Sequence, residues 1–243
     1  MLVSIIIPTL NEEENILRCL ACVKSQQCEF EVLVVDGGSS DSTRELARRD
    51  ACVIESVRGR AIQMNVGARH ARGELLLFLH ADSILPTDAL IHLRRAAQDP
   101  MVVGGTFTLS FDSDRLLLKL YSFFTRFRFR YFHYGDQGIF VKRAVFEQMR
   151  GYREIPFMED VDFLKRLYKT GRVVVIKKSV TTSARRFLER GLVRQQLLNC
   201  LLVSLYVLGV KPEVLVRWYK PKRSEKTTAL AAESPAPGVG PPN

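Results

Sequence analysis

The sequence predicts an α/β fold, with a doubly wound and mostly parallel sheet that has helices on both faces. Apolar runs typical of strands alternate with helical patterns through the first half of the chain. The first run, residues 2–7, is continuous and rich in β-branched side chains, as expected of a strand buried on both faces. With 243 residues, 47% of them hydrophobic, the chain is long enough to bury a sizeable core without disulfides.

Four strands and four helices are expected in the first half. The strands are predicted at residues 2–7, 31–36, 52–55 and 74–80, and the helices from 11 onward and over 42–49, 60–71 and 86–98. Asn11 is expected to cap the first helix and to place Glu12, Glu13 and Glu14 in its first turn, where the helix dipole favours acids. Pro86 suits the opening of the fourth helix.

The second half is less regular. Strands are predicted over 102–111, 138–141 and 172–176, helices over 160–169 and 189–208, and a mixed segment of aromatic and arginine residues over 116–131. We therefore divide the chain into an α/β domain (1–187), an apolar and basic helical extension (188–220) and a disordered tail (221–243). The tail holds five of the ten prolines and shows no apolar periodicity. The extension is expected to pack on the domain, to form a dimer interface or to lie at a membrane surface, and the sequence leaves these three open.

The formal charge of +10 favours anionic partners but does not choose among them. No RNA-binding motif is visible, so a nucleic-acid partner is not expected. Five cysteines do not suggest a disulfide framework, and Cys19 and Cys22 fit helix packing better than a zinc site. No signal peptide precedes the first strand, and the apolar run 197–210 is shorter than the roughly 20 residues that span a bilayer. A cytoplasmic protein is expected, with peripheral membrane contact as an open alternative.

Polar residues follow three of the strands. Thr9, Asp36 and Asp82 fall at carboxyl ends of predicted strands, where open α/β sheets bind their ligands. The first loop, residues 8–13, lacks the glycine-rich turn of dinucleotide folds and suits contacts to a base or ribose better than to a bare diphosphate. Asp36 can accept a hydrogen bond from a pyrimidine, or it can simply cap the following turn.

Charged residues suggest three further parts of a site. Arg60, with Asn65 further along, lies at a helix start that could bind a diphosphate, although a solvated basic turn is the plainer alternative. Asp82 could hold Mn²⁺ or Mg²⁺ together with substrate phosphates, or cap its loop. Arg185 and Arg186 could contact a leaving diphosphate or anionic headgroups, or belong to a solvated basic face.

Three acids lie close together at 159–162. Asp160 and Asp162 would not share a helix face, so joint chelation is not expected. One acid of this group could remove a proton from an acceptor hydroxyl. The alternative is a set of helix-start acids favoured by the dipole.

These segments together resemble the family 2 glycosyltransferases of the GT-A fold, over about residues 2–190. The matching segments, in the family's order, are Ile5 to Glu12, Val34 to Asp41, Leu79 to Asp82 and Met158 to Asp160. A bacterial subgroup of glycosyltransferase-like proteins associated with radical-SAM and selenoprotein-type domains is more similar still. Its added features are His80-Ala81-Asp82, Gly135 to Gly138 and Thr182 to Arg186.

The resemblance implies roles for the candidate residues. The expected nucleotide-sugar site comprises Pro8, Thr9, Glu12, Asp36, Arg60, Asn65 and Ala81, with Arg185 and Arg186 near the diphosphate. Asp82 would bind the divalent metal. His80 stands where the family's Asp-x-Asp motif has its first acid, which leaves it as a possible second ligand. Asp160 would be the general base, with Glu159 orienting it or the acceptor. The acceptor side would be Gly135, Asp136 and Gln137.

The expected reaction is inverting transfer of one sugar from a nucleoside-diphosphate sugar to an acceptor hydroxyl, with a lipid acceptor left open. The Gln-x-x-Arg-Trp motif of processive members is not present, which favours single transfer. A nucleotidyltransferase would need a glycine-rich and basic first loop, the opposite of residues 8–13. A catalytically degenerate protein that binds a nucleotide sugar or an anionic surface is the remaining alternative.

Overall fold

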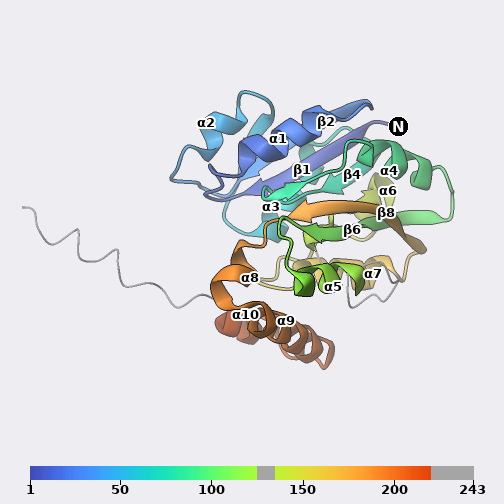
Figure 1. The fold of residues 1–243 in the computed structure, drawn as a ribbon. Helices are drawn as coiled ribbons and strands as arrows, with labels where there is room; N and C mark the ends of the chain where they lie inside the picture. The colour runs from blue at the N-terminus through green and yellow to red at the C-terminus, as the bar shows by residue number, and fades with distance from the viewer. Residues whose placement is uncertain (125–134, 220–243) are drawn as a thin grey trace, which may run out of the picture.

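The computed structural model describes residues 1–124 and 135–219, and over this part the chain forms one eight-stranded mixed sheet in the order β3-β2-β1-β4-β7-β6-β8-β5 (Figure 1). The strands are β1 Val3–Thr9, β2 Phe30–Asp36, β3 Cys52–Glu55, β4 Leu75–Phe78, β5 Ser83–Ile84, β6 Val102–Phe111, β7 Ile139–Lys142 and β8 Arg172–Thr182. Strands β1 to β4 are parallel, as are β6 and β8, whereas β7 and β5 run against their neighbours. The predicted α/β class with a mostly parallel sheet is confirmed.

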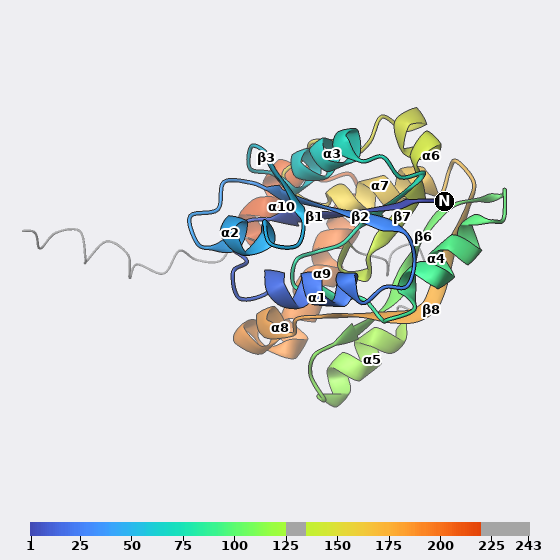
Figure 2. The same ribbon diagram turned by 90° about the horizontal axis from the view of Figure 1, so that it is seen from above.

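Helices cover both faces of this sheet. The first core packs α1 Ile16–Lys24, α2 Thr43–Ala47 and α4 Ala89–Ala97, and the second packs α3 Arg60–His70, α6 Arg143–Gln148 and α7 Glu159–Leu167. Side chains alternate along β1, since Ile5 and Ile7 belong to the first core and Ile6 to the second. Figure 2 shows α3 and α6 on one side of the strands and α1 on the other.

Helix α3 lies unusually close to the sheet. A β-carbon built on Gly67 would come within 2.4 Å of the Ile6 Cγ2 atom. Only glycine permits this approach without displacing β1. The contact fixes α3 against the centre of the sheet and holds its first residue, Arg60, near the carboxyl end of β1.

The first helix begins at Ile16, so the prediction that Asn11 caps it is wrong. Asn11 has a left-handed φ of 54°, and its Oδ1 atom accepts a hydrogen bond of 2.9 Å from the backbone N–H of Ser40. The backbone N–H of Glu12 donates to Thr43 Oγ1 at 2.8 Å. Because this loop is bound to the loop after β2, its acids lie in a turn before the helix rather than in the first helical turn.

The predicted helix 189–208 is interrupted. Gly191, with a φ of 87°, separates α8 Arg185–Arg190 from α9 Leu192–Val207, and a further helix, α10 Pro212–Tyr219, follows. Helix α6, strand β5 and the part of β8 beyond residue 176 were also not predicted. A short helix, or a strand defined mainly by its pairing with a neighbouring strand, has little hydrophobic periodicity that could be detected in the sequence. The remaining elements are α5 Leu116–Phe124 and the 3₁₀ turn Gly135–Gln137.

The helical extension packs on the α/β domain. Leu202, Val203 and Leu215 form a separate apolar cluster with residues around the start of α7, namely Phe157, Met158 and Val161. This packing is one of the three arrangements that the sequence left open. In Figure 1 helices α9 and α10 lie together at the bottom of the view, below β6 and β8.

Part of the extension keeps an exposed apolar surface, which includes Leu197, Leu201 and Leu208. Across residues 1–124 and 135–219, no helix combines the length and apolar character needed to cross a membrane. The predicted disordered tail, 221–243, and the end of the mixed segment, 125–131, lie outside the described residues.

The cluster predicts a stability difference between two leucines of α9. Leu202→Ala removes a fully buried side chain (0% exposed) and is expected to lower the free energy of unfolding by roughly 2–5 kcal/mol. Leu197→Ala, at 65% exposed, is the matched control on the same helix. Chemical denaturation checks this, and equal effects of the two substitutions would contradict the packing of the extension on the domain.

Candidate functional site

A cleft of about 520 Å³ opens at one edge of the sheet. Its floor is formed by the ends of the parallel strands β1, β6 and β8 and by the segment that follows β4. It brings together most of the residues expected from the sequence: Pro8, Thr9, Glu12, Arg60, His80, Ala81, Asp82, Asp136, Glu159, Arg185 and Arg186. Positions separated by more than half of the chain therefore share one cavity at the strand ends, as the topology requires.

Arg60 and Glu159 form an ion pair in the wall of this cleft. The distance from Arg60 Nε to Glu159 Oε1 is 2.7 Å, and the Glu159 side chain is only 4% exposed. Burial raises the pKa of Glu159, and the Arg60 charge opposes this. Met158 precedes Glu159 with a left-handed φ of 64°, so the chain turns sharply into α7 here. The pair thus connects the start of α3 to the start of α7.

His80 and Asp136 form a second pair, 2.9 Å apart between Nδ1 and Oδ1. Burial alone would raise the pKa of Asp136, but the hydrogen bond and charge of His80 hold it well below its usual range. The same contact raises the pKa of His80 against the effect of its own burial. The pair fixes the imidazole through one ring nitrogen, and its Nε2 atom is the one that remains for a metal.

Carboxylates crowd the floor of the cleft. Burial and the neighbouring charge of Asp136 raise the pKa of Asp82. Burial, together with the charge of Asp82, raises the pKa of Glu12. Such mutual repulsion is relieved by a divalent cation, and oxygen ligands are those that Mg²⁺ and Mn²⁺ prefer.

The oxygen ligands in the cleft thus suit a divalent ion that is also coordinated by a bound substrate. Among the described residues, no group of three or more His, Cys, Asp and Glu side chains could hold a metal by itself. One or two carboxylates are sufficient when diphosphate oxygens complete the coordination.

Arginines from α8 line the cleft as well. Arg186 donates a hydrogen bond from Nη1 to the Tyr219 hydroxyl, and its guanidinium carbon lies 5.5 Å from the centre of that ring. Arg185 approaches Glu14, with 3.4 Å between Nη1 and Oε2. The cleft therefore has acids from the loops after β1 and β4 and cations from α3 and α8, a distribution suited to a metal–diphosphate group.

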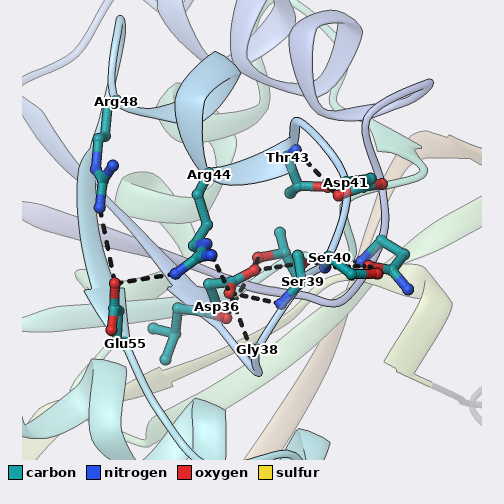
Figure 3. A network of polar contacts seen from close by, with 12 residues as sticks. Asp36, Gly38, Ser39, Ser40, Asp41, Thr43, Arg44, Arg48 and Glu55 are labelled. Carbon is teal, nitrogen blue, oxygen red and sulfur yellow. Dashed lines mark hydrogen bonds and ion pairs between the residues drawn. The ribbon is translucent and has the colours of Figure 1, made fainter. Parts of the chain in front are cut away.

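Asp36 is buried and does not line the cleft. Its Oδ1 atom accepts hydrogen bonds from the backbone N–H groups of Gly38 (3.0 Å) and Ser39 (2.9 Å), and Arg44 lies 3.8 Å away (Figure 3). The Ser39 hydroxyl donates to its Oδ2 atom. The carboxylate thus organises the loop that binds the segment 11–13, and its expected contact with a nucleoside stays a prediction.

Asn65 is also outside the cleft. Its side-chain amide donates to the backbone C=O of Tyr152 and accepts from the backbone N–H of the same residue, both at 2.9 Å. On the expected acceptor side, Asp136 lies in the 3₁₀ turn Gly135–Gln137 and lines the cleft. Gln137 is fully buried.

Asp160 lies in a neighbouring, smaller pocket of about 140 Å³. Its Oδ1 atom accepts a 2.8 Å hydrogen bond from the backbone N–H of Val161 at the start of α7. Asp162 is buried elsewhere, where it pairs with Arg166 at 2.7 Å and Arg153 at 3.2 Å. Asp160 and Asp162 therefore lie in different environments, in line with the expectation that they do not chelate a metal together.

Several lining residues were not found from the sequence. Gln63 is buried and donates from Nε2 to the backbone C=O of Thr9 and of Val35, both at 2.8 Å, which ties α3 to the ends of β1 and β2. Asn199 and Tyr219 reach the cleft from the extension. Asn199 interrupts an apolar run, which was a usable signal, whereas nothing local marked Gln63 or Tyr219.

Comparison with known proteins identifies the family. The model for glycosyl transferase family 2 matches residues 4–159. A PGL/p-HBAD biosynthesis glycosyltransferase of Mycobacterium bovis is 31% identical over 194 residues, which cover 70% of this chain and 71% of the relative. Glycosyltransferase AglE of Haloferax volcanii is 40% identical over 91 residues, but the match spans only 33% of this chain and 30% of that protein.

Solved structures share the fold. S. aureus TarS 1-349 in complex with UDP has a TM-score of 0.63 at 22% identity, covering 75% of this chain and 60% of that chain. Mannosyltransferase PcManGT from Pyrobaculum calidifontis, in complex with GDP-Man and Mn²⁺, has a TM-score of 0.60 at 22% identity, covering 74% and 56%. Similarity at this level establishes the GT-A architecture. The narrower radical-SAM-associated subgroup stays a prediction.

The contacts of Asn65 predict a structural rather than a binding defect. Asn65→Ala leaves two backbone groups of Tyr152 without their partner and is expected to lower the free energy of unfolding by roughly 1–3 kcal/mol. Nucleotide affinity, measured by calorimetric titration, should change little because Asn65 does not line the cleft. A large loss of affinity at unchanged stability would instead support the contact expected from the sequence.

Proposed function

The chain belongs to glycosyl transferase family 2, and on that basis we propose that it transfers one sugar from a nucleoside-diphosphate sugar to an acceptor hydroxyl with inversion at the anomeric carbon. The observation that carries the proposal is the pairing of an acidic and cationic cleft with a smaller pocket that holds a separate carboxylate, Asp160. The fold neighbours were solved with UDP, UDP-GlcNAc and GDP-Man, which are donors of this class or their product.

The donor would occupy the larger cleft. Pro8, Thr9, Glu12 and Ala81 are near the nucleoside and sugar in this proposal, and Arg60, Arg185 and Arg186 are near the diphosphate. Asp82 would hold Mn²⁺ or Mg²⁺, and the ion would offset the charge of the departing nucleoside diphosphate. The arginines add to that stabilisation without any change of protonation.

Asp160 would act as the general base. Its carboxylate takes the proton of the acceptor hydroxyl, while that oxygen forms a bond to the anomeric carbon. The bond from this carbon to the diphosphate oxygen breaks, and the leaving group keeps the electron pair. The hydrogen bond from the backbone N–H of Val161 to Oδ1 would orient this carboxylate at the start of α7.

Glu159 would have a positioning role. Its carboxylate is buried and engaged by Arg60 at 2.7 Å, so its electrostatic partner is already in place. A proton taken up there would break the ion pair and leave the Arg60 charge uncompensated. The pair instead fixes the backbone from which Asp160 projects.

A second function, binding of a nucleotide sugar without catalysis, remains a candidate because His80 replaces the first acid of the family's Asp-x-Asp motif and is bound to Asp136. Metal-dependent hydrolysis or transfer of the donor sugar distinguishes the two.

The base assignment predicts a loss of rate without a loss of donor binding. Asp160→Asn is expected to lower kcat by roughly 10²–10⁴-fold, the contribution of a positioned general base. Donor affinity should be kept because Asp160 does not line the larger cleft. Glu154→Gln, which neutralises an exposed acid nearby, is the matched control. Steady-state kinetics with donor titration tests this, and full activity of the Asp160 variant would eliminate it as the base.

The metal assignment predicts a loss of ion-dependent stabilisation. The melting temperature of the wild-type protein should rise more with a nucleotide sugar plus Mn²⁺ than with the same nucleotide sugar alone. Asp82→Asn should lose this increment, since it removes the proposed carboxylate ligand. Asp114→Asn, at a fully exposed carboxylate, should keep it. The same increment in the Asp82 variant would contradict the proposed ligand.

A further inference from the structure

The smaller pocket differs in chemistry from the larger cleft. The two share one wall, made of Arg60, Phe111, Asp136, Arg186, Phe187, Asn199 and Tyr219. The residues that belong to the smaller pocket alone are Leu109, Tyr121, Phe157, Met158, Asp160, Gln196, Leu202 and Val203. Most charged groups are thus in the shared wall, and the rest of the smaller pocket is predominantly apolar around one carboxylate.

Aromatic rings form much of this surface. Phe187 lies 5.2 Å from Phe111 in an edge-to-face arrangement and 6.2 Å from Tyr121. On another side, Phe157 lies 4.6 Å from Tyr219, between ring centroids. The rings pack against one another in the geometries that aromatic side chains prefer, and together they present an apolar surface to a bound group.

The size of the pocket limits its occupant. A dry apolar cavity of roughly 150 Å³ holds a molecule the size of benzene, and this pocket measures about 140 Å³. A hexose of that size would bury several hydroxyls, and each one left without a partner costs roughly 1–3 kcal/mol. Asp160 and Gln196 are the side chains specific to the pocket, besides the Tyr121 hydroxyl, that offer strong polar partners. The part of the pocket away from the shared wall therefore suits an apolar group better than a polar sugar ring, since Arg60, Asp136, Arg186, Asn199 and Tyr219 lie only in that wall.

The position of the pocket matches that of an acceptor. The donor fills the larger cleft in the proposed reaction, and the nucleophile must approach across the shared wall with its hydroxyl at Asp160. We infer that the acceptor carries this hydroxyl on an apolar, ring-sized group that binds among Tyr121, Phe187 and Leu202. This inference rests on the proposed function and defines its acceptor class. The apolar group can be an aromatic ring or an isoprenoid unit, which have the same chemistry in this pocket.

Three acceptors test the inference with the full chain, Mn²⁺ and the sugar nucleotide that gives the largest thermal shift. These are 4-methylphenol, farnesol and methyl glucoside, and mass spectrometry detects the glycosylated product. We expect a kcat/KM at least about tenfold higher for the phenol or the isoprenoid alcohol than for the sugar, the discrimination typical of an apolar pocket. A preference for the phenol indicates that the natural acceptor carries an aromatic ring, and a preference for farnesol indicates that it is an isoprenoid lipid.

Transfer to methyl glucoside that equals or exceeds transfer to both apolar acceptors would overturn the inference and leave the proposed function standing. Hydrolysis of the donor without transfer to either apolar compound would overturn it too. If the protein neither binds nor turns over any sugar nucleotide, the proposed function itself fails.

A variant of α5 provides an independent test. Tyr121→Ala removes a ring specific to the smaller pocket and is expected to raise the KM for the apolar acceptor about tenfold. Tyr121→Phe keeps the ring and should restore the wild-type KM. Phe123→Ala, a half-exposed ring on the same helix that lines neither pocket, is the matched control. An acceptor KM for Tyr121→Ala equal to that of the control, in folded protein, would contradict the inference.

Discussion

The ion pair between Arg60 and Glu159 is the contact on which the arrangement of the site depends. It joins the first residue of α3 to the first residue of α7, across the 2.7 Å between Nε and Oε1. Arg60 also lines both cavities, so the pair lies in the wall between the larger cleft and the smaller pocket. Because the buried carboxylate of Glu159 needs this cation, the start of α7 is fixed, and with it the position of Asp160.

Charge is distributed within the cleft by elements from different parts of the fold. The acids come from the loops that follow β1 and β4, from the 3₁₀ turn and from the start of α7, whereas two of the arginines come from α8. The raised pKa values of Glu12 and Asp82 reflect burial together with the proximity of other acids. Acids and arginines in one cleft suit a ligand that brings both a divalent ion and a diphosphate.

The extension contributes more than a covering layer. Helices α9 and α10 bury Leu202 and Leu215 against the residues around the start of α7, and they also bring Asn199 and Tyr219 into the cavities. Tyr219 in turn receives the hydrogen bond from Arg186. The extension predicted from its apolar and basic residues is therefore part of the site. Its apolar residues pack α9 and α10 on the domain, and these helices carry the polar residues Asn199 and Tyr219.

The sequence patterns are sufficient to predict most of the sheet and the edge at which the site lies. The apolar strands placed the polar residues Thr9, Asp36 and Asp82 at one edge, since the carboxyl ends of parallel strands lie together there, and Thr9 and Asp82 do line the cleft. The sequence did not determine which side chains turn into the cavity. Asp36 and Asn65 were expected to face a nucleotide, yet they bind the Gly38–Ser39 backbone and that of Tyr152. The Arg60–Glu159 and His80–Asp136 pairs and the separate pocket of Asp160 could not be predicted in this way, because each depends on contacts between segments far apart in the chain.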